Sequence, residues 1–104
     1  MKKYKTSVIK KKLGRFIRVR PIISDRSGEA VRNQYEIIFE HGNAFQSYDS
    51  LIGIRIGDKL YLTDCHDYST TTSKYCTTWC GWNGNERREG LKSGKFLFLD
   101  SSEM

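Results

Sequence analysis

The sequence predicts a small single domain of the α+β class, an antiparallel meander sheet of about five strands with one helix packed across it. A chain of 104 residues has the size of one domain. Between residues 16 and 63, short runs of apolar and polar side chains alternate with the period of two that strands show. After residue 69 the spacing becomes helical, and the single apolar face of the sheet needs such a cover.

The domain is expected to span residues 1–104 and to begin with a basic N-terminal arm over residues 1–14. The apolar residues of this arm are Tyr4, Val8, Ile9 and Leu13. Their spacing fits one side of a short helix, although a strand over Lys5–Ile9 is an alternative. Phe16–Arg20 then alternates as a strand. Pro21 at its end predicts an edge strand or a strand terminus, because proline cannot donate to a ladder.

Turn residues divide the middle of the chain into short strands. The predicted strands are Asn33–Glu40, Ala44–Tyr48, Leu51–Ile56 and Lys59–Thr63. Gly57 and Asp58, between the last two, are the strongest hairpin signal in the chain. Consecutive short strands joined in this way favour an antiparallel meander.

A helix is predicted after this meander. Its apolar stripe is Tyr75, Cys76, Trp79 and Cys80. Ser69 or Thr70 suits the N-cap, and Gly81 suits the C-cap. Residues 83–94 are polar and glycine-rich, which predicts a flexible loop, and Lys95–Leu99 alternates as a last strand.

The positive charge is concentrated at one end of the chain. The first 20 residues hold nine basic side chains and no acidic one, whereas the remaining residues sum to −3. This asymmetry suggests a basic edge that contacts an anionic partner, although lysine and arginine also protect exposed strand edges. The residues predicted to bind a partner or nucleic acid are Lys2, Lys3, Lys5, Lys10, Lys11, Lys12, Arg15, Arg18 and Arg20. With Phe16 beside Arg18 and Arg20 on one strand face, aromatic stacking and charge would suit single-stranded nucleic acid.

The cysteines and histidines do not have the spacing of a metal site. Cys65 and His66 are adjacent, so both can rarely reach one ion, and Cys76 and Cys80 lack a zinc-knuckle spacing. We therefore expect no metal and read the three cysteines as free core thiols, while ligation stays open. No motif for a nucleophile, a phosphate loop or a cofactor is present, so we predict no catalytic residue, no cofactor and no enzyme.

One enzymatic alternative remains. His66, flanked by Asp64 and Asp67 and followed by Lys74, has the composition of a ribonuclease-like general acid site. The chain shows neither a secretory signal nor an apolar run of membrane-spanning length. We therefore expect a cytoplasmic protein without a membrane partner.

Three segments carry a resemblance: Ser47–Gly53, Leu60–Leu62 and Asp67–Lys74. They are similar to a family of small uncharacterised phage and plasmid proteins with the pattern S-Y-x-[ST]-x-I-A, a hairpin, and Y-S-x-T-T-x-[KR]-H before an apolar helix end. The matching positions, which we interpret as structural, are Ser47, Tyr48, Ser50, Ile52, Tyr68, Ser69, Thr71, Thr72 and Lys74. Gly53 replaces the usual alanine, and Tyr75 replaces a histidine, which weakens any catalytic role of that position.

The resemblance implies no activity, but it implies a setting in bacterial mobile elements, whose small proteins often block host machinery. The first hypothesis is therefore a phage or mobile-element accessory protein that acts by binding a host protein or ribonucleoprotein in the bacterial cytoplasm. An anti-CRISPR-like inhibitor of a host defence complex is the specific form of this hypothesis. The alternative is a nucleic-acid-binding module that uses the basic N-terminus, and the third is the ribonuclease-like enzyme. The identity of the partner and the oligomeric state stay open.

Overall fold

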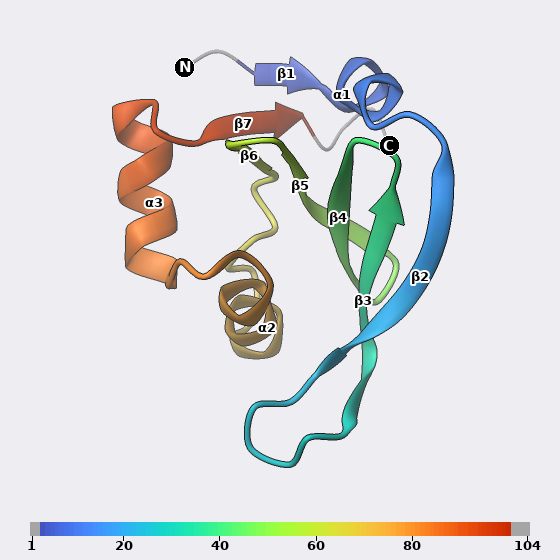
Figure 1. The fold of residues 1–104 in the computed structure, drawn as a ribbon. Helices are drawn as coiled ribbons and strands as arrows, with labels where there is room; N and C mark the ends of the chain where they lie inside the picture. The colour runs from blue at the N-terminus through green and yellow to red at the C-terminus, as the bar shows by residue number, and fades with distance from the viewer. Residues whose placement is uncertain (1–2, 101–104) are drawn as a thin grey trace.

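The computed structural model describes residues 3–100 as one seven-stranded sheet with three helices (Figure 1). In chain order the elements are β1 Lys3–Lys5, α1 Thr6–Lys12, β2 Phe16–Ile23, β3 Ala30–Phe39, β4 Gly42–Ser47, β5 Ser50–Ile56, β6 Lys59–Leu62, α2 Thr70–Cys80, α3 Gly84–Ser93 and β7 Leu97–Asp100. The order of strands across the sheet is β1-β7-β6-β5-β4-β3-β2. In the part of the chain that is described, no helix is long and apolar enough to span a membrane.

The predicted antiparallel five-stranded meander with one helix is wrong. Strands β2 to β6 pair antiparallel with their chain neighbours, but β7 pairs parallel with both β6 and β1. The chain leaves β6, forms α2 and α3, and only then returns as β7, which is the crossover connection that parallel strands require. The sheet is therefore mixed, and β1 completes it beyond β7.

The predicted flexible loop over residues 83–94 is also wrong, because these residues form α3. Asn83 Oδ1 accepts from the Glu86 N–H at 2.9 Å, and Glu86 Oε1 accepts from the Asn83 N–H at 2.9 Å. This capping box starts the helix, and Gly94 ends it with a left-handed backbone, at a φ of 85°. The polar composition concealed the helix because its inward residues include Arg87 and Gly90 rather than a run of apolar side chains.

Both faces of the sheet are apolar, whereas the sequence suggested one. On one face, α2 and α3 cover the cluster Ile22, Phe45, Ile52, Leu60, Leu62, Cys76, Trp79, Leu91 and Phe96. On the other face, the short helix α1 packs into the cluster Ile9, Leu13, Ala44, Leu51, Ile54, Tyr61 and Leu99. A register shift in the β4–β5 pairing gives β5 one extra residue, so that Ile52 and Ile54 serve different clusters.

Trp79 packs α2 against the sheet. Its ring stacks on Phe45 with centroids 5.7 Å apart, and its Nε1–H donates to Asn43 Oδ1 at 2.9 Å. The ring passes over Gly53, where an added Cβ would lie 2.9 Å from a ring carbon and 3.0 Å from the Tyr61 carbonyl oxygen. Residue 53 must therefore be glycine, because the Trp79 ring leaves no room for a side chain there.

We predict that Gly53→Ala lowers the free energy of unfolding by about 1–3 kcal/mol, because the added methyl overpacks a closed core. Urea denaturation followed by tryptophan fluorescence measures this change. Gly84→Ala is the matched control, since its Cβ would meet nothing closer than 3.4 Å in the first turn of α3. Equal urea midpoints for Gly53→Ala and the parent protein would contradict the requirement for glycine at residue 53.

Candidate functional site

A buried arginine joins α3 to α2 and to the turn that precedes α2. Arg87 of α3 is fully buried. Its Nε donates to His66 Nδ1 at 3.0 Å, and its two Nη atoms donate to oxygens of Thr77, Trp82, His66 and Ser73 at 2.7–3.4 Å. Within residues 3–100 no carboxylate lies within ion-pair distance of this guanidinium. The charge is thus held by neutral acceptors, which fix where α3 sits.

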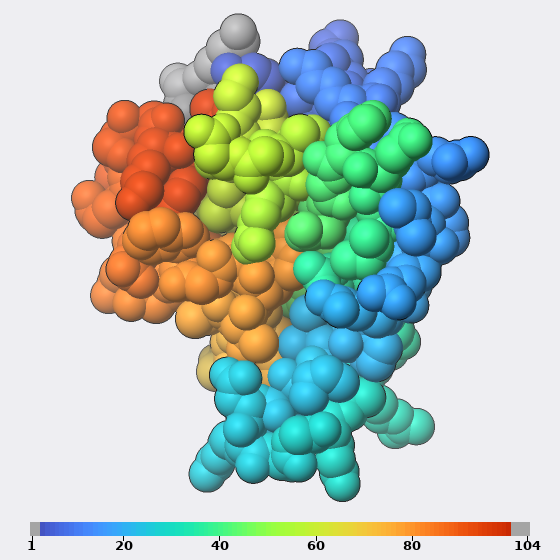
Figure 2. All heavy atoms as spheres, viewed as in Figure 1, coloured from blue at the N-terminus to red at the C-terminus, as the bar shows by residue number. Residues whose placement is uncertain are grey.

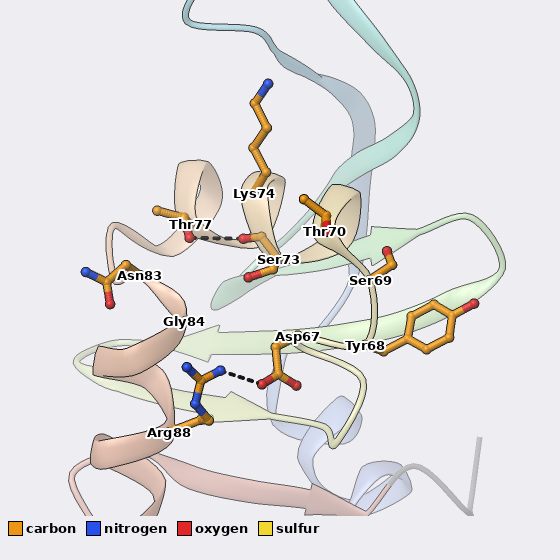
Figure 3. Close-up of a pocket in the computed structure, with 10 residues that line it drawn as sticks. All are labelled: Asp67, Tyr68, Ser69, Thr70, Ser73, Lys74, Thr77, Asn83, Gly84 and Arg88. Carbon is orange, nitrogen blue, oxygen red and sulfur yellow. Dashed lines mark hydrogen bonds and ion pairs between the residues drawn. The ribbon is translucent and has the colours of Figure 1, made fainter.

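His66, the predicted general acid of the ribonuclease hypothesis, is buried in this network. Burial lowers the pKa of its imidazole, and the nearby Asp67 carboxylate opposes the shift only in part. The ring is therefore neutral at pH 7, and its Nδ1 accepts a hydrogen bond from Arg87 Nε at 3.0 Å. Figure 3 shows Lys74 pointing away from Asp67 into solvent. His66 Nε2 lies 4.0 Å from Asp67 Oδ1, so this pair stays together while Lys74 points away from it.

An open hollow of about 640 Å³ lies above this network, between the N-terminal ends of α2 and α3 (Figure 3). An ion pair of 2.7 Å between Arg88 and Asp67 crosses it. Burial of Asp67 disfavours its ionised form, but the hydrogen bond from Arg88 and the charge of nearby groups lower the carboxyl pKa below its usual value. The two charged groups satisfy each other, so the hollow presents mainly hydroxyl groups and the exposed ring of Tyr68.

The family-motif residues meet around the start of α2. Ser69 Oγ accepts from the Thr72 N–H at 3.1 Å and caps the helix. Thr72 Oγ1 is 2.9 Å from Ser47 Oγ of β4, and both side chains are buried. These hydroxyl contacts fasten α2 to the sheet across 25 residues of sequence.

The other motif residues occupy different places. Ser50 pairs with Ser47, Ile52 is buried in the α2-side cluster, and Tyr48 adopts a φ of 54° in the β4–β5 turn. Tyr68, Thr71 and Lys74 are exposed.

The predicted basic residues do not form one cluster. Lys3 and Lys5 lie on β1, and Arg18 and Arg20 lie on β2, which are the two outermost strands of the sheet. The helix α1 lies between these two strands in the chain, and its last turn contains Lys10, Lys11 and Lys12. Arg15 lies in the connection between α1 and β2. All of these side chains are exposed, and Lys2 lies outside the described residues. Arg15 pairs with Glu40 at 3.9 Å and Arg20 with Glu36 at 2.7 Å, which neutralises part of the charge.

The expected face of Phe16, Arg18 and Arg20 is not formed. A register shift after Phe16 leaves one extra residue in β2, so Phe16 pairs with Phe39 and Val19 with Ile37 on one face. Arg18 and Arg20 pair with Ile38 and Glu36 on the opposite face. A single extra residue reverses every later side chain, which is why simple alternation failed here.

We call Phe16, Val19, Ile37 and Phe39 the apolar face. Phe16 and Val19 are 54% and 50% exposed, and the Phe16 and Phe39 rings meet edge to face at 6.1 Å. The seven-residue helix α1 covers only part of this side of the sheet. A hollow of about 220 Å³ opens beside α1, lined by Lys10, Leu13, Ile37, Phe39, Ala44, Gln46, Asp49, Leu51 and Ile54.

Among the described residues, no group of three or more histidine, cysteine, aspartate or glutamate side chains is placed to hold a metal ion. The three cysteines are free thiols. Sequence reasoning missed Arg87 and the apolar face. The capping box of α3 was visible as Asn83 and Glu86, and it could have placed Arg87 on a helix.

We predict that Arg87→Met lowers the free energy of unfolding by more than about 3 kcal/mol, because several buried acceptors lose their donor. Arg88→Met is the control, since Arg88 is exposed and its ion pair with Asp67 is worth at most about 1 kcal/mol. Thermal and urea denaturation measure both. Similar losses in the two variants would show that the buried network does not hold α3.

The lowered pKa of His66 also predicts a pH dependence of stability. The unfolded chain protonates this imidazole near pH 6.5, whereas the folded chain resists protonation, so folding stability is full above that pH and falls as the pH drops below it. Urea midpoints between pH 7.5 and pH 5 test this. His66→Asn retains an acceptor for Arg87, and its midpoint should fall less over the same range. Parallel profiles would contradict the prediction.

Residues 17–95 match the model of DUF8033, a family of unknown function. No curated protein and no solved structure gives a significant match. The matched region runs from the second residue of β2 past the end of α3 and contains the Arg87 network, while α1 and β7 lie outside it. Because the match extends over more than half of the chain, the protein belongs to the DUF8033 family.

Proposed function

We propose that the protein acts by binding a protein partner through the surface formed by β2 and α1. In this proposal it is a phage or mobile-element accessory protein that inhibits a host defence complex, such as a CRISPR effector, in the bacterial cytoplasm. The setting rests on the resemblance of the motif around Ser47–Gly53 and Asp67–Lys74. The choice of surface rests on the geometry of β2.

The observation that carries the proposal is the exposure of large apolar side chains along β2. Phe16, Ile17 and Val19 are 54%, 56% and 50% exposed at the start of a strand of eight residues, and Ile23, 49% exposed, lies at its far end near α2. Apolar patches of this kind mark interaction sites. Three of the four residues are aliphatic, which suits a protein partner better than nucleic acid bases, since bases stack on aromatic rings.

The hollow beside α1 adds a second element to this surface. Its volume of about 220 Å³ suits one large apolar side chain of a partner, and interface energy is concentrated in anchors of that type. The exposed Lys10, Lys11 and Lys12 at the end of α1 add positive charge beside it. Charge at the margin of an interface mainly speeds encounter, so the expected partner is acidic.

The partner is expected to contact side chains of β2 rather than extend the sheet. β2 is an outermost strand, as Figures 1 and 2 show along the right edge of the molecule. However, Pro21 lacks an N–H group and the register shift near Ile17 twists the strand, and both features discourage edge-to-edge pairing.

Nucleic acid binding is the second candidate. It is favoured by Lys10, Lys11, Lys12 and Arg18, which form no ion pair within 4.0 Å among residues 3–100. Phe16 is the aromatic residue of β2, and a single ring offers little stacking surface. We therefore rank nucleic acid below a protein as the expected partner.

We predict that Phe16→Ala combined with Val19→Ala raises the Kd for the defence complex about 30-fold, the cost of losing anchors worth about 2 kcal/mol. Affinity capture of the purified host effector measures binding, and phage plaquing on an immune host measures inhibition. Tyr68→Ala is the control, because Tyr68 is exposed in the other hollow. Loss of binding in Tyr68→Ala with retention in the β2 variant would move the site to the hollow of Figure 3.

We predict that replacing Lys10, Lys11 and Lys12 with glutamine slows association about tenfold at low salt and leaves dissociation unchanged, because peripheral charge acts on encounter. Surface plasmon resonance at several salt concentrations separates the two rates. A labelled oligonucleotide provides the competing test. Tight, salt-sensitive binding of the oligonucleotide that survives the Phe16 and Val19 changes would replace the proposal with the nucleic acid candidate.

A further inference from the structure

A cysteine faces a third hollow, one that shares no residue with the surface proposed for partner binding. This hollow of about 250 Å³ lies at the end of α2, where Cys80 and Trp82 meet the β5–β6 hairpin. Arg55, Lys59 and Lys95 also line it, while Asp58 is the acidic residue of its lining. Cys80 is half-buried and therefore accessible from the hollow, whereas Cys76, one helical turn earlier, is buried.

The surroundings of Cys80 supply donors to its sulfur. The backbone N–H of Trp82 donates to Sγ at 3.4 Å. The Cys80 thiol donates to the Trp82 carbonyl at 3.5 Å, and Arg87 Nη1 donates to the same carbonyl at 2.7 Å, so that oxygen keeps a donor when the thiol loses its proton. Arg55 Nη2 donates to the Trp79 carbonyl at 2.8 Å and so reduces the negative potential at the end of α2.

These contacts favour the thiolate of Cys80. A hydrogen bond from the Cys76 thiol is the largest cause that lowers the pKa of Cys80 below its ordinary value, with the Trp82 N–H and the charge of Arg87 acting in the same sense against burial. The same hydrogen bond and burial raise the pKa of Cys76, which keeps its proton. Arg87 has no carboxylate within ion-pair distance in the described chain, so a thiolate on Cys80 also compensates a buried cation.

The charges that line the hollow also favour anionic molecules as those that reach Cys80 Sγ. The Lys95 ammonium lies 3.8 Å from the centroid of the Trp82 ring, and Arg55 stacks on Trp79 at 5.0 Å. Together with Lys59, these groups give the lining three positive charges against one negative charge. A small anion is therefore attracted to the opening.

We propose that Cys80 is a modification site that reacts with small anionic disulfides. The Cys80 thiolate attacks one sulfur of the small disulfide, and a new S–S bond forms between Cys80 and that half. The original S–S bond breaks, and the other half leaves as a thiolate with the electron pair. Cys80 is oxidised and the small disulfide is reduced, so the exchange needs no further oxidant.

The test compares an anionic with a neutral disulfide, 5,5′-dithiobis(2-nitrobenzoate) and 4,4′-dithiodipyridine, by stopped-flow absorbance between pH 5 and pH 9. We expect one fast thiol per chain, with a rate midpoint well below the ordinary value near 8.5. At pH 6 its reaction should be about tenfold faster than that of an unperturbed thiol, since the larger thiolate fraction outweighs the lower nucleophilicity. Peptide mapping of briefly treated wild-type protein should place the label on Cys80.

Cys65→Ser is the matched control, because burial and the Asp64 carboxylate raise the pKa of Cys65. The fast phase should persist in Cys65→Ser and disappear in Cys80→Ser. Lys59→Gln with Lys95→Gln should lower the ratio of anionic to neutral rates about tenfold. A label that maps to Cys65 or Cys76, or a rate midpoint above pH 8, would overturn the thiolate assignment. An unchanged ratio in the lysine variant would overturn the preference for anions.

Discussion

The guanidinium of Arg87 is the constraint on which the C-terminal half of the structure depends. It is fully buried, and its donors reach the turn before α2, the body of α2 and the connection to α3. A buried cation with no carboxylate partner among residues 3–100 is stable only if its donors find acceptors, so the position of α3 tolerates little change. The return of the chain as β7, parallel to β6, follows from that position. The potential at Cys80 follows from it too, because Arg87 is among the groups that stabilise its thiolate.

The helices cover the two faces of the sheet to different extents. On the α2 side, Trp79 closes over Gly53 and Phe45, and hydroxyl contacts from Ser47 and Thr72 hold the start of the helix. On the α1 side, a helix of seven residues leaves Phe16 and Val19 half exposed and a hollow open beside it. One face of the sheet is therefore closely packed, whereas part of the other face is exposed and available for contact.

Local features of the chain could be predicted from the sequence, and features that depend on distant residues could not. The helix with Ser69 as N-cap and Gly81 as C-cap is confirmed, as is the position of β2 at an edge of the sheet. The parallel pairing of β7 was missed because it joins residues that no local pattern connects. The side on which Phe16 lies was missed because one extra residue reverses the alternation. Arg87 was missed because an arginine is normally read as a surface residue.

The place of β7 between β6 and β1 has a consequence for how the chain folds during synthesis. The only strand neighbour of β1 in the described sheet is β7, with Lys3 opposite Phe98 and Lys5 opposite Asp100, and Thr6 Oγ1 donates to the Asp100 carbonyl at 2.7 Å. Among the described strands, β1 is thus synthesised before the others but is the last to find its partner, since that partner is made about 95 residues later. The antiparallel hairpins of β2 to β6 can form earlier from neighbouring residues. A nascent chain stalled before residue 97 would therefore present a partly folded meander with β1 unpaired, a form that exposes backbone to chaperones and proteases.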